Sequence, residues 1–256
     1  MRAMRCACTS LPTGPSIKST AMSSKAPARA DAANGREHTT DEIAEKISAA
    51  ILEHRLMPGT KLGEDRLATI FGTSRAKVRE VLGRLAHEQM VELIPQRGAF
   101  VAKPTIEQAH DVFEARRLIE PGVLRRLIGS IDDFKMQRLR RHLDAEADAR
   151  KRDDKRAIVR LSGEFHVLLA ELAGNSALAR TMRELSTLTC LIISLYDAPT
   201  ATSCRADEHE AIVAALGRGD VPGAETLMLH HLDHIEQSLK LDMPEQDADL
   251  ESILRA

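Results

Sequence analysis

Aromatic side chains are scarce in this chain of 256 residues: they make up 2% of it, with no tryptophan, one tyrosine and five phenylalanines. β-Sandwiches and β-barrels depend on aromatic and β-branched residues, whereas alanine, leucine, isoleucine, arginine and glutamate dominate here. The composition therefore favours helices that pack through aliphatic side chains. The length leaves room for one large domain or two of ordinary size.

Long apolar runs are also missing, since none approaches the roughly 18 residues that a transmembrane helix requires. We therefore exclude a membrane protein. The four cysteines, Cys6, Cys8, Cys190 and Cys204, are widely scattered. Their spacing matches neither a zinc ribbon nor a disulfide framework and suits a reducing compartment, so we expect a cytoplasmic protein.

An excess of charge of either sign is absent as well, because 36 Lys and Arg face 38 Asp and Glu for a formal net charge of −2. Any contact with nucleic acid must come from a local patch. The polar, basic residues 1–37 cannot bury a core and lack the apolar stretch of a secretory signal. We interpret them as an unstructured leader, or an over-extended start ahead of Met22; a basic arm that contacts DNA phosphates is the alternative.

Beyond residue 37 the pattern changes to amphipathic helices, the first with Thr40 as its N-cap. Gly72 breaks the second helix, and Thr73 or Ser74 caps the third. Two short strands joined by a turn-forming sequence follow. The expected segments are helices at 40–54, 64–71 and 74–89 and strands at 91–94 and 99–101. This order is that of a winged helix-turn-helix, which we assign to residues 38–103.

After Pro104 the sequence predicts helices only. Ser130 is the expected N-cap of the second of them, Gly174 ends the third, and Pro121 should kink or split the first. We place the helices at 106–128, 131–152, 155–173, 176–197, 206–217 and 221–241. The fold class is therefore mainly α: an N-terminal winged helix-turn-helix, then an all-helical antiparallel bundle over 104–241 for effector binding and dimerisation, and a tail at 242–256.

The third helix carries a cationic stripe. Its apolar residues Val78, Leu82 and Leu85 share one side, which leaves Arg75 and Arg79 together on another. The N-terminal end of such a helix fits the major groove, where arginine bonds a guanine edge and serine or lysine holds phosphate. The strand-joining turn adds a basic residue and a glycine. The candidate DNA-binding residues are Ser74, Arg75, Lys77, Arg79, Arg97 and Gly98. The alternative is a set of solvated helix charges.

Polar residues on apolar helix faces mark a candidate effector pocket. Arg116 projects within an inner sector of its helix and needs a partner, which is either Glu120 one turn on or the carboxylate of a ligand. His166, His209 and His231 also point inward, from three separate helices. Taken singly, each is most simply a hydrogen-bonded core residue. Together they form a three-nitrogen site for Zn²⁺ or a similar divalent ion if they converge.

Residues 47–101 resemble the GntR family of bacterial transcriptional regulators. The resemblance rests on Leu67-Ala68, Phe71-Gly72-Thr73-Ser74-Arg75, Val78-Arg79-Glu80-Val81-Leu82 and Pro95-Gln96-Arg97-Gly98-Ala99-Phe100-Val101. It implies that the six candidate residues above contact operator DNA. Lys77 departs from the family, which usually has proline or a small polar residue there.

The helical part is similar to the C-terminal FCD domain of FadR-like members, through segments 114–120, 165–175, 208–212 and 228–232. In metal-binding members the ligands are three histidines, here His166, His209 and His231, and an aspartate one turn before the first. Ser162 stands at the aspartate position, so we expect weaker metal affinity and a water as fourth ligand. A metal-free pocket in which the histidines bind an organic acid directly is the alternative. We assign Arg116, Ser162 and Asn175 to effector binding.

The function expected from these features is that of a homodimeric regulator on palindromic operator DNA, a repressor released by a small carboxylate. The scarcity of aromatic walls favours a small polar acid over a flat heterocycle. We expect no enzyme, because the sequence has neither a HExxH motif nor a glycine-rich phosphate loop. The alternatives are a metal-dependent helical enzyme fused to a DNA-binding module, and an architectural DNA binder without an effector.

Overall fold

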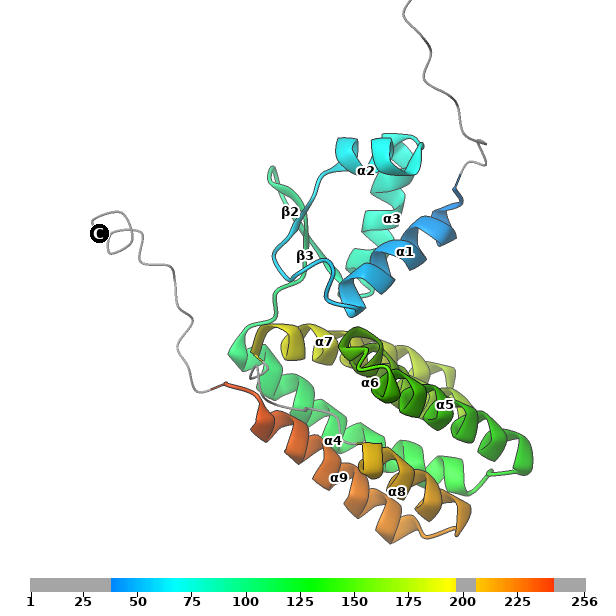
Figure 1. The fold of residues 1–256 in the computed structure, drawn as a ribbon. Coiled ribbons are helices and arrows are strands. Elements are labelled where there is room, and N and C mark those ends of the chain that lie inside the picture. The colour runs from blue at the N-terminus through cyan, green and yellow to red at the C-terminus, as the bar shows by residue number, and fades with distance from the viewer. Residues whose placement is uncertain (1–37, 197–205, 242–256) are drawn as a thin grey trace, which may run out of the picture. The chain divides into compact units, whose positions relative to one another are not determined.

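The computed structural model describes residues 38–196 and 206–241. Our interpretations of segments 1–37 and 242–256, and of Cys6, Cys8 and Cys204, lie outside these residues. In chain order the elements are α1 (Thr40–Leu52), β1 (Lys61–Leu62), α2 (Glu64–Phe71), α3 (Arg75–His87), β2 (Val91–Ile94), β3 (Gly98–Val101), α4 (Ile106–Ile128), α5 (Asp133–Lys151), α6 (Lys155–Leu172), α7 (Ser176–Tyr196), α8 (Ala206–Gly217) and α9 (Val221–Ser238) (Figure 1). Within the described ranges, no helix is long and apolar enough to cross a membrane.

The N-terminal elements form the winged helix-turn-helix that the sequence predicts. Its sheet has the antiparallel order β1-β3-β2, and β1, which the sequence pattern did not reveal, pairs Lys61 with Phe100. The inner face of α3 buries Val78, Leu82 and Leu85 almost completely, as their spacing predicts. Gly72 ends α2 with a left-handed backbone at φ +60°, which turns the chain into α3.

Two helix starts differ from the sequence prediction. The N-cap of α1 is Thr39 rather than Thr40, because Thr39 and Glu42 close a reciprocal capping box through bonds of 3.1 and 3.0 Å. The N-cap of α5 is Asp132 rather than Ser130. The Asp132 carboxylate accepts the Lys135 amide at 2.8 Å, while the Ser130 hydroxyl donates back to the Leu127 carbonyl.

Of the kink or split expected at Pro121, the split is not observed, since one helix, α4, runs from Ile106 to Ile128. Proline removes one backbone hydrogen bond, but the residues on either side of it are anchored in the core. Phe113, Val123 and Leu124 are all essentially buried. Packing on both sides of Pro121 therefore holds the helix together where local preference would interrupt it.

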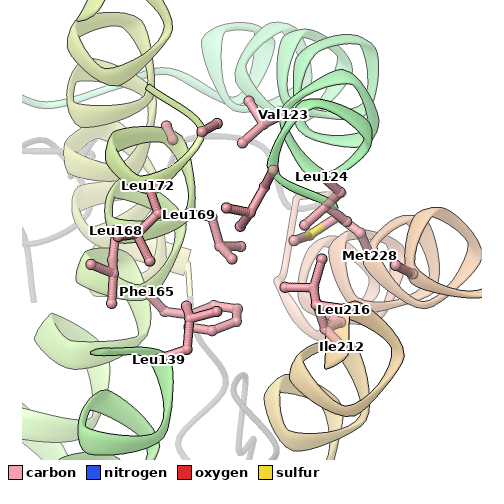
Figure 2. Close-up of a cluster of buried hydrophobic side chains, with 14 of the residues drawn as sticks. Val123, Leu124, Leu139, Phe165, Leu168, Leu169, Leu172, Ile212, Leu216 and Met228 are labelled. Atoms are coloured by element: carbon pink, nitrogen blue, oxygen red, sulfur yellow. The ribbon is translucent and has the colours of Figure 1, made fainter. Parts of the chain in front are cut away.

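Helices α4 to α9 form the bundle, in which α6 packs on α7, α4 on α9, and α5 on α6. All six helices contribute to its apolar core, and the residues labelled in Figure 2 come from α4, α5, α6, α8 and α9. Phe165 in this core lies flat on the imidazole of His209, with ring centroids 4.0 Å apart. The apolar core thus borders directly on a buried polar region.

Candidate DNA interface and histidine centre

The two arginines of the cationic stripe are exposed and held from the neighbouring helix. The Arg79 guanidinium donates to both carboxylate oxygens of Glu64 at 3.1 and 2.7 Å, and the Arg75 Nε lies 3.1 Å from Asp65. Glu64 and Asp65 are the first two residues of α2. The hydrogen bond from Arg79 lowers the pKa of Glu64, so this carboxylate stays ionised. From the sequence, Glu64 is predicted only as the start of a helix, and its contact with the recognition arginines is not predicted.

The remaining candidate DNA contacts surround this pair. Ser74 caps α3 by accepting the Lys77 amide at 3.2 Å, and the Lys77 ammonium donates to the His38 carbonyl. Arg97 and Gly98 are exposed at the β2-β3 turn, where Gly98 has φ +98°. The Arg97 guanidinium lies 5.6 Å from the ring centroid of Phe100. The tip of the wing is therefore cationic and leaves its backbone open to approach.

Three histidines converge in the interior of the bundle, as the sequence suggested. His166, His209 and His231 come from α6, α8 and α9, and each is at most 2% exposed. The Nε2 atom of His231 lies 3.2 Å from that of His209 and 3.3 Å from that of His166. One nitrogen of each ring lies within 4.8 Å of the others. Three imidazoles at this spacing fit a zinc-like divalent ion.

Each histidine is oriented through its other nitrogen by a glutamate from a different helix. The Nδ1 atom of His166 lies 2.6 Å from Glu120, that of His209 3.0 Å from Glu146, and that of His231 2.7 Å from Glu208. A carboxylate at Nδ1 fixes the proton there and leaves the Nε2 lone pair for a ligand.

Of these three glutamates, only Glu120 is among the partners predicted from the sequence. A signal for Glu146 was available, because it continues the inner stripe of Leu139, His142 and Ala149 on α5. Glu208 directly precedes His209, and nothing local marks it as the partner of a histidine on another helix.

Burial keeps His166 and His231 neutral, whereas the three glutamates stay charged. Desolvation lowers the pKa of His166 to about 3 and that of His231 to about 4. Burial alone would raise the pKa of Glu120, but the Arg116 charge and the hydrogen bonds to His166 and Arg116 together outweigh it and hold the value at about 2. At neutral pH His166 and His231 therefore offer uncharged ring nitrogens, which is the protonation state that a metal requires.

Arg116 realises the ion pair that its spacing predicts and still has a donor to spare. Its side chain is 1% exposed; Nε donates to Glu120 at 2.6 Å and Nη1 to the Thr189 hydroxyl at 3.1 Å. The third nitrogen, Nη2, is buried and has no hydrogen-bond partner in the described part of the chain. A buried cationic donor without an acceptor is costly, so an oxygen of a bound ligand that accepts from Nη2 would stabilise this side chain.

The other two candidate effector residues differ in their surroundings. Ser162 is buried one turn before His166 on α6, where its spacing puts it. Asn175 instead caps α7, because its side-chain oxygen accepts the amides of Ala177 and Leu178 at 3.0 and 3.2 Å. The structure therefore gives Asn175 a structural role at a helix start and shows it bonded to no residue of the histidine centre.

Comparison with known proteins agrees with this architecture. The profile described as "Bacterial regulatory proteins, gntR family" matches residues 39–101, and that of the FCD domain matches residues 111–234. An HTH-type transcriptional regulator of Streptomyces ambofaciens is 32% identical over 203 residues, which cover 78% of this chain and 84% of that protein. The HTH-type transcriptional repressor RspR of Escherichia coli is 26% identical over 208 residues, covering 81% and 91%.

A solved structure supports the fold independently. McbR/YncC of E. coli superposes with a TM-score of 0.68 at 17% identity, covering 77% of this chain and 95% of that one. The two matched profiles coincide with the winged helix-turn-helix and the bundle described above. The chain therefore belongs to the gntR family of bacterial regulatory proteins, with an FCD domain as its helical part, and is a DNA-binding transcriptional regulator.

Proposed function

We propose that this regulator is a repressor whose affinity for operator DNA is set by a small organic acid bound at the histidine centre, together with a divalent metal. One observation carries the proposal: three buried imidazoles turn their Nε2 atoms toward one another beside an arginine with an unused donor. RspR is named a repressor, which supports the sign of the response.

His166, His209 and His231 would hold the metal, and a bound divalent ion would supply a Lewis-acidic centre for the oxygens of a ligand. Glu120, Glu146 and Glu208 act as positioning residues, because they fix the Nδ1 protons of these histidines. Ser162 contributes no charge where metal-binding relatives have aspartate. The donor set is then neutral and leaves more positive charge for an anionic ligand to balance.

Arg116 would receive the carboxylate of the acid. Two of its nitrogens are taken by Glu120 and Thr189, which hold the guanidinium plane in place. The remaining Nη2 donor is available for one charge-assisted hydrogen bond. The ion pair and the ligand clamp, which the sequence posed as alternatives, are thus compatible.

The DNA-binding domain would contact the operator through its six candidate residues, Ser74, Arg75, Lys77, Arg79, Arg97 and Gly98. Glu64 and Asp65 keep the two stripe arginines extended into solvent, where phosphate and base edges can replace the carboxylates. We further propose a homodimer on a palindromic operator, formed through the FCD domain. The acid changes DNA affinity only if it binds one arrangement of the dimer better than the other.

Metal analysis of protein purified without chelator tests the histidine centre. We expect about one divalent ion per chain, lost in His209→Ala and retained in His230→Ala, which removes an exposed histidine of α9. Equal metal content in the two variants would contradict the assignment. A metal-free wild type that is still stabilised by small carboxylates, and not after His209→Ala, would support direct binding of the acid by the histidines.

Electrophoretic mobility shifts with the region upstream of the gene test the recognition helix. Arg79→Ala should lower operator affinity about 5- to 150-fold, because a bidentate contact is worth about 1–3 kcal/mol. Arg84→Ala is the matched control, since Arg84 lies on the same helix and pairs with Asp41 and Glu88. Unchanged sequence-specific binding by Arg79→Ala would overturn the assignment.

A further inference from the structure

A cavity of about 570 Å³ lies between α5, α6 and α7, away from the histidine centre. None of the three converging histidines lines it, nor does Arg116; Leu52 and Met90 complete its lining. Its volume lies within the range of small-molecule sites in proteins. The cavity is therefore large enough for a small molecule and is distinct from the histidine centre.

Much of the lining of this cavity is apolar, and the lining includes one buried hydroxyl without a hydrogen-bond partner among the described residues. Ala145, Gly163, Val167, Leu168 and Cys190 line it. A Cβ atom on Gly163 would lie 2.9 Å from the Cys190 sulfur, so the glycine is what lets α6 and α7 approach here. Ser186, also in the lining, is 3% exposed, and its hydroxyl has no hydrogen-bond partner among the described residues.

The charged side chains of the lining are predominantly cationic. Four arginines stand against two glutamates, and three of the arginines are within ion-pair distance of these glutamates. The fourth, Arg141, is exposed and has no ion pair or hydrogen bond with any residue that the structure describes. His142 lines the same cavity. The charged residues concerned are Arg138, Arg141, Arg160, Arg183, Glu164 and Glu171.

We propose that this cavity is a second ligand site, for a small amphipathic carboxylate. The apolar body of the ligand would occupy the space between α5, α6 and α7, and its carboxylate would meet Arg141. The net positive charge of the lining favours an anion, and the unpartnered Ser186 hydroxyl offers a hydrogen bond to a polar atom of the ligand. A short polar acid would leave the apolar walls uncovered and should bind poorly.

Isothermal titration of the full chain with decanoate, in buffer containing EDTA, tests this site. We expect saturable binding of one decanoate per chain and none of acetate. Arg141→Gln should weaken binding about three- to tenfold through loss of a charge-assisted hydrogen bond. Ala145→Phe should abolish it by filling the cavity. Arg140→Gln removes the same charge from the preceding position of α5, which does not line this cavity, and this variant should bind decanoate as the wild type does.

Equal decanoate affinity in the wild type, Arg141→Gln and Ala145→Phe would overturn the proposal. If Ala145→Phe does not fold, the comparison of Arg141→Gln with Arg140→Gln decides. Decanoate binding that disappears in EDTA would place the ligand on a metal instead and also overturn it. Absence of decanoate binding, with Ala145→Phe converting a dimer to a monomer, would show that a second copy of the chain covers this face. Because the titration is done without metal, failure here leaves the proposed role of the histidine centre untouched.

Discussion

The Arg79–Glu64 pair of the DNA-binding domain and the Arg116–Glu120 pair of the FCD domain join the same two side chains in opposite surroundings. The Arg79 side chain is 67% exposed, whereas the Arg116 side chain is 1% exposed. An exposed pair contributes little to folding because water competes for both charges, so its arginine can exchange a carboxylate for a phosphate or a base. A buried pair cannot separate without leaving a charge uncompensated. Exposure therefore suits an arginine that must change partners, and burial suits one that must hold its place.

The same contrast extends to the two cores. Every buried polar or charged residue of the described chain lies in the FCD domain, between Arg116 and His231. The DNA-binding domain is held together by aliphatic side chains such as Ile43, Ile47 and Leu85. The DNA-binding domain thus has its candidate functional residues on the surface, whereas the FCD domain has buried polar and charged residues in its interior.

The largest expected effect comes from breaking the buried pair. Glu120→Ala leaves the Arg116 charge in the interior without its partner and removes the acceptor beside His166. We expect a loss of about 3–5 kcal/mol in the free energy of unfolding, measured by urea denaturation. Glu114→Ala, at an exposed position of the same helix, should change it by less than about 0.5 kcal/mol. A loss below about 1 kcal/mol for Glu120→Ala would contradict the role given to burial.

Acid should destabilise the metal-free protein through its neutral histidines. The folded pKa values of His166 and His231, about 3 and about 4, lie below the ordinary value of 6.5. Below pH 6.5 the unfolded chain therefore takes up protons that the folded chain excludes, and stability falls with pH. Between pH 6.5 and 5.5 we expect a loss of about 2 kcal/mol, since each group approaches about 1.4 kcal/mol per pH unit.

Glu120 and Glu146, with folded pKa values of about 2, add losses in the same direction below pH 4.5. Urea denaturation in EDTA across this range is the measurement. His166→Gln should flatten the dependence between pH 6.5 and 5.5. A flat wild-type profile from pH 7 to 5 would show that these histidines are not held neutral.

A smaller effect is expected from the second partner of Arg116. Thr189→Val removes the oxygen that accepts from Nη1, without changing the shape of the side chain much. Leaving this buried donor unpaired should cost about 1–2 kcal/mol in urea denaturation. Thr187→Val provides the matched control, because Thr187 is buried on the same helix and has no hydrogen bond to Arg116. Equal losses of unfolding free energy in the two variants would show that the hydrogen bond between Arg116 and Thr189 makes no specific contribution to stability.

How much of this was predictable depends on whether a feature is local. Helical periodicity predicts the inward direction of His209 and His231 and the pairing of Arg116 with Glu120, since these follow from the spacing along one helix. Pairs between helices, such as His209 with Glu146, depend on tertiary packing that no spacing encodes. A charged residue in a sequence is normally solvated, so the position of Glu146 on the inner stripe of α5 can signal its burial but does not identify His209 as its partner.

The predictions of two helix starts and of a split in α4 were wrong for a related reason. Near each of these helix starts, more than one polar residue could serve as the N-cap. Thr39 and Asp132 do so because their side-chain oxygens accept the backbone amide three residues further along the chain. At Pro121 the loss of one hydrogen bond is real, but the buried residues around it decide the outcome. Packing in the core therefore outweighs the local preference of proline to interrupt a helix.

The smallest effect on folding, and the sharpest test of the exposed pair, is expected from Glu64→Gln. Because Arg79 is exposed and Glu64 is partly exposed, water competes for both charges, and the midpoint of urea denaturation should not move. On DNA the substitution removes a carboxylate that competes with phosphate for both stripe arginines. Non-specific affinity should rise, and the plot of log affinity against log salt should steepen by about one unit.

Operator affinity should gain less than non-specific affinity, so the ratio of the two falls. Glu88→Gln is the control, because Glu88 pairs with Arg84 at the other end of α3 and faces no candidate DNA contact. If Glu64→Gln and Glu88→Gln have the same salt dependence, Arg79 does not exchange its carboxylate for DNA. The exposed pair would then be an ordinary surface ion pair, and exposure alone would not distinguish an arginine that changes partners.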